Sequence, residues 1–384
     1  MSMNKEREIT IAILSVSLIT VMAGAIVAPA MASLSQFFSE QSASVIKLVV
    51  TLPALIVIPT AMATGRLADR LGRRKLLLIG LILYLFGGLG GAFASSFYVL
   101  LCFRAILGLS VGLVMPLSTG LVSDFFHGEE ARQMMGWISA ANHFGGMAAQ
   151  VVSGALAVMS WRYSFGVYGI ALVSLLFAAF WIPETHKQDQ KEQTTHLPLE
   201  TYCNAAFMLI LMVVFYTVPL NISLLVENSG MGSATASGLA CALATGAPFL
   251  VGIYFQSITK RLGSYAVFTA LCVMGMGMFT VGEANNLVMI FAGAFLVGTG
   301  EGYLFPHIMN AVRATVPPKD SVRALAVMSS MLYLGQFLSP ITIDALDALC
   351  FDPTTSQPFM VAWTLCAVAA AVSLGFTVKQ KVRR

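Results

Sequence analysis

Long apolar runs alternate with short polar connections along the chain, and this pattern predicts membrane-spanning helices. The clearest runs are Ile9 to Leu34, Leu76 to Ala94 and Phe359 to Val378. A transmembrane helix needs about 20 mostly apolar residues, whereas a barrel strand needs only about 10 of alternating polarity. Apolar windows of helical length predict twelve spans, at 9–32, 45–64, 76–94, 98–122, 133–158, 163–182, 203–225, 235–258, 264–282, 287–311, 322–343 and 358–378.

The polar stretch 184–200 divides these spans into two groups of six. We therefore predict an N-terminal half at 1–183, a cytoplasmic linker at 184–200 and a C-terminal half at 201–384. The expected fold is an all-α integral membrane protein with two pseudo-symmetric six-helix bundles around a central cavity. A shift of 190 residues supports the symmetry, because it superimposes Pro29 on Pro219, Gly108 on Gly298, Gly112 on Gly302, Pro116 on Pro306 and Gly145 on Gly335.

The composition excludes an ordinary soluble domain, because 57% of the residues are apolar and only 10% are charged. The basic residues also orient the chain. With both termini in the cytoplasm, all of the 22 Lys and Arg residues except Lys47, Arg104 and Arg162 fall on the inner side. The positive-inside rule therefore predicts a multi-pass protein of a plasma membrane of bacterial type, with cytoplasmic N- and C-termini.

Several other functions are not supported by the sequence. The apolar run after Lys5 and Arg7 is too long for a cleaved signal core, so we expect it to remain as a helix. The six cysteines form no CxxC pair, and no metal site is predicted. The net charge of +4 is spread over the connections and defines no surface for nucleic acid. No nucleotide-binding loop is present, so we expect no cofactor and no use of ATP.

The connection after the second span reads GRLADRLGRRK, from Gly65 to Lys75. It resembles the loop signature of the major facilitator superfamily at every defining position. Gly65 is expected to permit close helix packing, Gly72 to supply a turn, and Asp69 to cap a helix start or pair with a cation. The resemblance implies a gate in which Asp69 and Arg70 latch the two halves, with Asp124 and Arg132 as charge partners. The full set of expected gating residues is Gly65, Asp69, Arg70, Gly72, Arg73, Asp124 and Arg132.

Two further segments are similar to elements of that superfamily. Arg104, in RAILG, matches its Arg-x-x-x-Gly element and is expected to set the charge of the cavity, unless it reaches outward to the membrane surface. In the fifth span, Gly136 and Gly145 keep the spacing of the antiporter signature, but Gln150 stands where that signature has proline. Small residues at this spacing also occur in ordinary helix packing.

Glu301, in GTGEG of the tenth span, is the acid that we expect to carry protons. Burial in a membrane disfavours an unpaired carboxylate, so the group can exchange a proton as the cavity opens and closes. The alternative is a carboxylate fixed by a cation such as Arg104 or by backbone that the glycines expose. His143 and His307 are further proton-coupling candidates, although a lone histidine is commonly a packing residue. The remaining expected cavity contacts are Arg104, Asn142, Gln150, Tyr216, Asn221, Tyr303 and Asn310.

These features predict a secondary transporter that exports small amphipathic drugs or metabolites by proton antiport with alternating access. Because the first span lacks an acid, an importer or facilitator of a small metabolite or organic anion is the alternative. A membrane sensor, or an enzyme that uses the cavity, is a third reading, but no HExxH motif or Ser/His/Asp set supports it. We expect a monomer in the bilayer, whose partners are a small-molecule substrate and protons.

Overall fold

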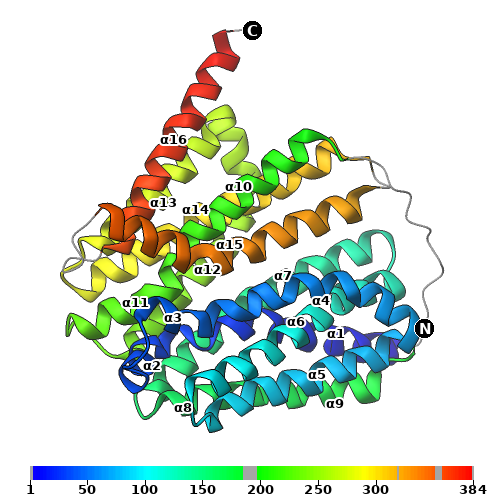
Figure 1. Cartoon of the computed structure of the whole chain (residues 1–384). Helices are drawn as coiled ribbons and strands as arrows, with labels where there is room; N and C mark the ends of the chain where they lie inside the picture. Colours follow the sequence, from blue (N-terminus) through cyan, green and yellow to red (C-terminus); the bar gives the residue numbers. More distant parts are fainter. Residues whose placement is uncertain (1–2, 185–196, 318–319, 351–356, 383–384) are drawn as a thin grey trace. The chain divides into compact units, whose positions relative to one another are not determined.

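The computed structural model describes residues 3–184, 197–317, 320–350 and 357–382, and their regular structure is entirely helical (Figure 1). Most of the expected linker 184–200 lies outside these residues. The chain separates into two compact units, residues 1–194 and 195–384. Each unit is described here by itself.

The N-terminal unit is built from long helices joined by very short connections. Its helical elements are α1 (Met3–Ala25), η1 (Ala28–Ala30), α2 (Met31–Phe37), α3 (Ala43–Ile46), α4 (Leu48–Leu71), α5 (Arg73–Gly90), η2 (Gly91–Phe93), α6 (Phe97–Phe125), α7 (Gly128–Ala157), α8 (Trp161–Ser164), η3 (Phe165–Ile170) and α9 (Ala171–Trp181). Within this unit α6 packs against α4 and α5, and α1 packs against α7 and α9.

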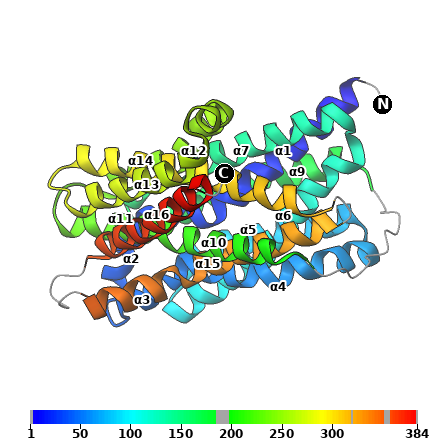
Figure 2. The same ribbon diagram turned by 90° about the horizontal axis from the view of Figure 1, so that it is seen from above.

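The C-terminal unit repeats this order of long helices. Its elements are α10 (Leu199–Phe215), α11 (Thr217–Asn228), α12 (Ala234–Leu262), η4 (Gly263–Tyr265), α13 (Ala266–Gly282), α14 (Leu287–Thr315), α15 (Ser321–Cys350) and α16 (Pro358–Val382). Here α14 packs against α12 and α13, and the three helices run alongside one another in both views (Figures 1 and 2).

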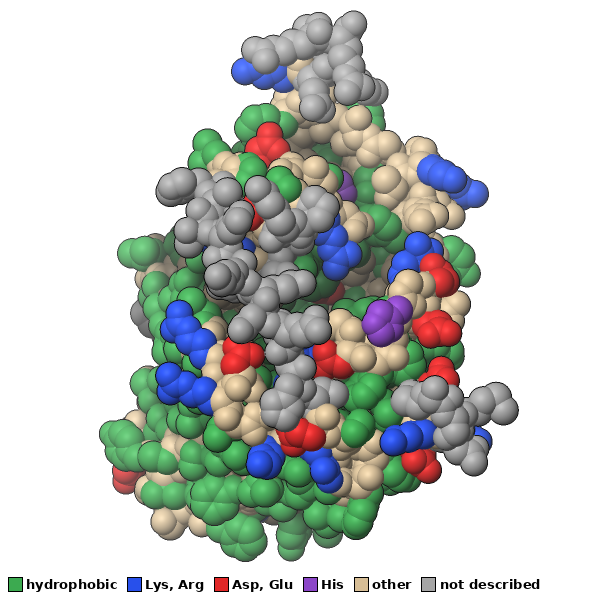
Figure 3. Space-filling model, turned by 90° about the vertical axis from the view of Figure 1, so that its right-hand side faces the viewer, with side chains coloured by type: hydrophobic (Ala, Val, Ile, Leu, Met, Phe, Trp, Pro, Cys, Tyr) green, Lys and Arg blue, Asp and Glu red, His purple; other side chains and the backbone are tan. Residues whose placement is uncertain are grey.

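Ten of the described segments are long and apolar enough to cross a membrane. One of them, Ala234–Gly282, contains both α12 and α13. The helix α7 is not among the ten, because polar residues such as Asn142, His143 and Gln150 lower its mean hydropathy. The helices are consistent with the twelve predicted spans and establish a multi-pass membrane protein. Charged side chains lie across the face shown in Figure 3, whereas its lower edge is mainly hydrophobic.

The first long helix of each unit is broken at a proline. Pro29 has no N–H group to offer Ala25, and α1 ends at Ala25. In the second unit Pro219 stands four residues after Phe215, where α10 ends. The sequence predicted spans at 9–32 and 203–225, and one segment long and apolar enough to cross a membrane lies at each place, Lys5–Phe37 and Leu199–Asn228, with the break inside it.

Other features of the two units are also separated by 190 residues. The helices α6 and α14 both have 29 residues, from 97 to 125 and from 287 to 315. Ser96 caps α6 by accepting a hydrogen bond from Val99 N, and Asn286 caps α14 by accepting one from Met289 N. The 190-residue repeat in the sequence therefore corresponds to a repeat of helices.

Candidate transport site

Arg104 of α6 is fully buried inside the N-terminal unit, with no exposed side-chain surface. Its Nη1 donates a 2.8 Å hydrogen bond to the Tyr168 hydroxyl, and its guanidinium carbon lies 4.7 Å from the centre of the Phe165 ring. Among the described residues, Nε and Nη2 have no hydrogen-bond partner, and no carboxylate pairs with Arg104. Aromatic faces and a neutral hydroxyl therefore hold this cation in place of an acid. An arginine that reaches outward to the membrane surface is excluded.

The tyrosine that holds Arg104 also binds the end of the first helix. The Tyr168 hydroxyl donates a 2.7 Å hydrogen bond to the carbonyl of Ala23, close to the break after Ala25. Ser153 of α7 donates to the carbonyl of Ile26 in the same break. Because these carbonyls lie where the regular helix ends, side chains replace the missing backbone donors.

The helix α7 presents both packing residues and polar residues. A Cβ atom at Gly145 would lie 2.4 Å from the carbonyl oxygen of Leu18 in α1, so glycine is needed for this contact. Asn142 accepts a 3.1 Å hydrogen bond from Thr20, and His143 is half-buried. Gln150 is buried, and its side-chain oxygen has no partner among the described residues. Of the two glycines with the spacing of the antiporter signature, Gly145 therefore serves helix packing, whereas Gly136 has nothing within 4 Å of its Cβ position.

In the C-terminal unit Glu301 lies among glycines that bring neighbouring helices together. A Cβ atom at Gly298 would lie 2.2 Å from the carbonyl oxygen of Ala244 in α12, and one at Gly300 would lie 2.7 Å from that of Ala270 in α13. Only 9% of Glu301 is exposed. Its carboxylate makes no ion pair or hydrogen bond with any residue that the structure describes. The glycines therefore hold an unpaired acid inside the unit.

One tyrosine from a neighbouring helix lies near this acid. Tyr216, directly after α10, interacts electrostatically with Glu301, and also with Tyr333 of α15. The helix α10 packs against both α14 and α15, the helices that carry Glu301 and Tyr333. A carboxyl group beside neutral hydroxyls can gain or lose a proton without breaking an ion pair. This arrangement is suited to proton exchange.

The other polar candidates of this unit are used mainly in packing. The ring of Tyr303 stacks on Phe255 at 5.0 Å and on His307 at 5.7 Å, and its hydroxyl lies 3.1 Å from that of Thr259. Asn221 donates a 2.9 Å hydrogen bond to the carbonyl of Thr217 in its own helix. Asn310 is exposed.

The expected gating loop is a turn of one residue, because α4 ends at Leu71 and α5 begins at Arg73. Gly72 has φ +84°, a conformation that favours glycine, as predicted for a turn. Two expected contacts are not found within the described residues of the N-terminal unit. Gly65 has open space where a Cβ would lie, so it is no packing contact within its unit. Asp69 is exposed in the last turn of α4, caps no helix start and has no ion pair among the described residues.

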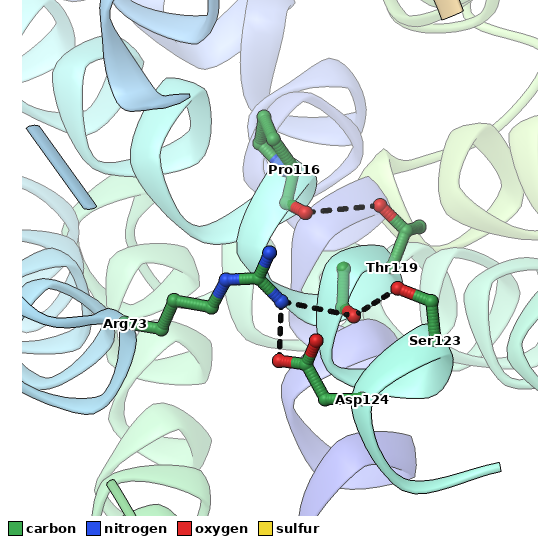
Figure 4. Close-up of polar contacts among 6 residues, drawn as sticks. Arg73, Pro116, Thr119, Ser123 and Asp124 are labelled. Atoms are coloured by element: carbon green, nitrogen blue, oxygen red, sulfur yellow. Dashed lines mark hydrogen bonds and ion pairs between the residues drawn. The ribbon is translucent and has the colours of Figure 1, made fainter. Parts of the chain in front are cut away.

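Asp124 was expected to be a charge partner of the Asp69 and Arg70 latch. It forms an ion pair with Arg73. Arg73 Nη1 contacts the Asp124 carboxylate and donates a 3.4 Å hydrogen bond to the carbonyl of Gly120 (Figure 4). Arg132 pairs with Glu129 of its own helix at 3.6 Å. The first turn of α5 is thereby fastened to the last turns of α6 inside one unit.

Sequence reasoning missed Tyr168, the hydrogen-bond partner of the buried Arg104. A tyrosine inside an apolar span was the available signal, because a buried hydroxyl needs a hydrogen-bond partner. Within the described residues no group of three or more His, Cys, Asp or Glu side chains is placed to hold a metal ion. The site thus consists of buried charges and hydroxyl groups.

Long apolar helices in two repeated units, with a buried cation in one unit and a buried acid in the other, define a membrane transporter. The sequence profile of the major facilitator superfamily matches residues 13–340, and the chain belongs to this superfamily. It is therefore a transporter of small molecules and not an enzyme.

The similar proteins that carry a functional name are distant relatives. The quinolone resistance protein NorA of Staphylococcus aureus (strain MSSA476) is 26% identical over 313 residues, which cover 78% of each chain. The class B tetracycline resistance protein of Escherichia coli is 26% identical over 216 residues, 54% of this chain and 53% of that protein. Among solved structures, a D-xylose–proton symporter has a TM-score of 0.78 at 16% identity, covering 95% of this chain and 96% of that one. The structural likeness concerns the fold alone.

Proposed function

We propose that this transporter exports small amphipathic molecules, drugs or metabolites, across the plasma membrane in exchange for protons. The observation that carries the proposal is Glu301, a buried acid near Tyr216 that makes no ion pair with any described residue. The two resistance proteins at 26% identity favour export over import. The proton gradient supplies the energy, and the protein acts as a monomer without a cofactor.

In the proposed cycle Glu301 takes up a proton while the cavity is open to the outside. It releases the proton to the cytoplasm after the cavity has closed to the outside and opened to the inside. Substrate enters once the proton has left. The deprotonated carboxylate of Glu301 is then costly to bury away from water, so the cavity stays open long enough for substrate to bind. Tyr216, which interacts electrostatically with Glu301, is the proposed neighbour of the carboxylate in this cycle. His143 and His307 remain secondary proton candidates.

We also propose that the Gly72 turn belongs to a cytoplasmic gate, with both termini on the same side. The Arg73–Asp124 pair fixes the base of this gate within the N-terminal unit. Asp69 and Arg70 are exposed and so remain available as the latch. The polar residues of α7, Asn142 and Gln150, are proposed substrate contacts.

A second candidate function is import or facilitated diffusion of a small organic anion. The buried cation Arg104, with no carboxylate partner among the described residues, favours it. This alternative predicts substrate movement down its own gradient without proton exchange.

Proteoliposomes with an imposed pH gradient test the proposal. Proton flux is recorded after adding cationic, neutral or anionic amphiphiles to wild type and to Glu301→Gln. We expect a substrate-evoked proton flux in wild type that is lost in the variant. Glu227→Gln is the matched control, because Glu227 is a second acid in a membrane helix and already accepts a 2.8 Å hydrogen bond from Ser223.

The outcomes separate the candidates. Proton flux that persists in Glu301→Gln at every pH contradicts the assignment of Glu301. Substrate transport that proceeds without proton movement favours the facilitator. Loss of flux in Glu227→Gln alone transfers the proton role to that residue.

A further inference from the structure

The C-terminal unit has an apolar groove between α10, α13 and α16. Its volume is about 780 Å³, and Ile210, Leu271, Val368, Val372 and Phe376 line it. These three helices belong to segments long and apolar enough to cross a membrane. An apolar face of such a segment meets the hydrocarbon of the bilayer wherever protein does not cover it.

Much of the groove wall is uncovered. Val368 is 62% exposed and Phe376 is 71% exposed. The lining residues on α16 run from Leu365 to Lys379, which is about 21 Å along a helix. One leaflet with its headgroups is roughly 20–22 Å thick. The groove thus has the length of one phospholipid.

The polar groups of the groove lie at one end. Lys379 is exposed there, and no acidic side chain lines the groove. Ser264 is exposed at the same end, where its carbonyl accepts a 3.2 Å hydrogen bond from Thr377. Lys260 and Arg261, at the end of α12, precede Ser264 closely in sequence. This end is therefore basic and suited to an anionic headgroup.

We propose that the groove between α10, α13 and α16 binds an anionic phospholipid, with an acyl chain along Val368, Val372 and Phe376 and the phosphate at Lys379 and Ser264. The apolar wall matches the chain, and the cation matches the phosphate. This inference needs only the membrane location of the helices. It is independent of the substrate and of proton coupling.

Native mass spectrometry of protein released from nanodiscs tests the proposal. The nanodiscs contain equal amounts of phosphatidylglycerol and phosphatidylcholine. We expect the wild-type protein to retain phosphatidylglycerol in preference to phosphatidylcholine. Ala369→Trp, which fills the groove, is expected to abolish retention. Ala367→Trp is the matched control, because Ala367 is exposed on the same helix outside the groove.

A second variant addresses the headgroup. Lys379→Gln should lower the preference for phosphatidylglycerol roughly fivefold, as expected for one cation near an anionic lipid surface. The proposal is overturned if Ala369→Trp retains as much lipid as Ala367→Trp, or if both lipids are retained equally by wild type. A wild-type dimer that Ala369→Trp converts to a monomer would assign the groove to a second copy. Thermal unfolding of each variant confirms that it is folded.

Discussion

Arg104 and Tyr168 form a buried pair in which the hydroxyl group accepts a hydrogen bond from the guanidinium and donates its own to the carbonyl of Ala23. One side chain thereby connects α6 to the end of α1. No carboxylate takes part among the described residues. Arg104 is enclosed by its own unit, so in this conformation it acts on the first helix through Tyr168.

Tyr168→Phe should therefore destabilise the protein by about 1–3 kcal/mol. The change removes the acceptor of Arg104 and the donor to Ala23 while keeping the ring. Thermal unfolding in detergent measures the effect. Tyr163→Phe is the control, because Tyr163 is 56% exposed and should change stability by less than about 0.5 kcal/mol. Equal effects of the two variants would show that the hydrogen bonds are unimportant.

Gly72→Ala should cost about 1–3 kcal/mol, because the backbone has φ +84° and a side chain there is strained. The new Cβ would also lie 2.2 Å from the carboxylate of Glu184. Gly65→Ala is a contrasting variant in the same motif. Gly65 lies in a helix with open space around it, so alanine should stabilise by about 0.5–1 kcal/mol. The two melting temperatures should therefore move in opposite directions, and a parallel shift would contradict this view of the turn.

A double-mutant cycle on Arg73 and Asp124 should give a coupling energy of about 1–3 kcal/mol. Their side chains are only 11% and 19% exposed, and the contact is a charged hydrogen bond. The pair Arg132 and Glu129 provides a comparison, with exposures of 82% and 64%. Its coupling should be about 0.2–0.5 kcal/mol. If both cycles gave the same small value, the Arg73 contact would not anchor α5.

Gly298→Ala should destabilise the C-terminal unit by about 1–3 kcal/mol, since the added Cβ would meet the backbone of Ala244 at 2.2 Å. Backbone cannot give way as a flexible side chain can. Gly252→Ala in α12 is the control, because nothing lies within 4 Å of its Cβ position. Thermal unfolding and proton flux of Gly298→Ala should decline together if this packing also holds Glu301 in place.

Periodicity and charge predicted the fold well. The fourth span, expected at 98–122, is α6 from 97 to 125, because its apolar run ends at polar residues on both sides. The sequence analysis made no prediction of the helix breaks, although Pro29 and Pro219 were visible in the sequence. A proline shows that one hydrogen bond is lost, but not whether the helix bends or stops.

The polar contacts were harder to predict than the helices. The loop offers several cations in a short segment, and only the direction of the Gly72 turn decides that Arg73, not Arg70, meets Asp124. Tyr168 reaches Arg104 from 64 residues away in the sequence. Such contacts depend on how the helices pack, and a local sequence pattern does not specify this packing.

The offset of 190 residues also reveals what the two halves do not share. The counterpart of Arg104 is Ala294, and the counterpart of Glu301 is Val111. Each ionisable group therefore corresponds to an aliphatic residue at the equivalent position of the other half. If the halves arose from one ancestral bundle, these positions changed after duplication. The two halves keep the same arrangement of helices, but the N-terminal half holds the buried cation Arg104 and the C-terminal half holds the buried acid Glu301.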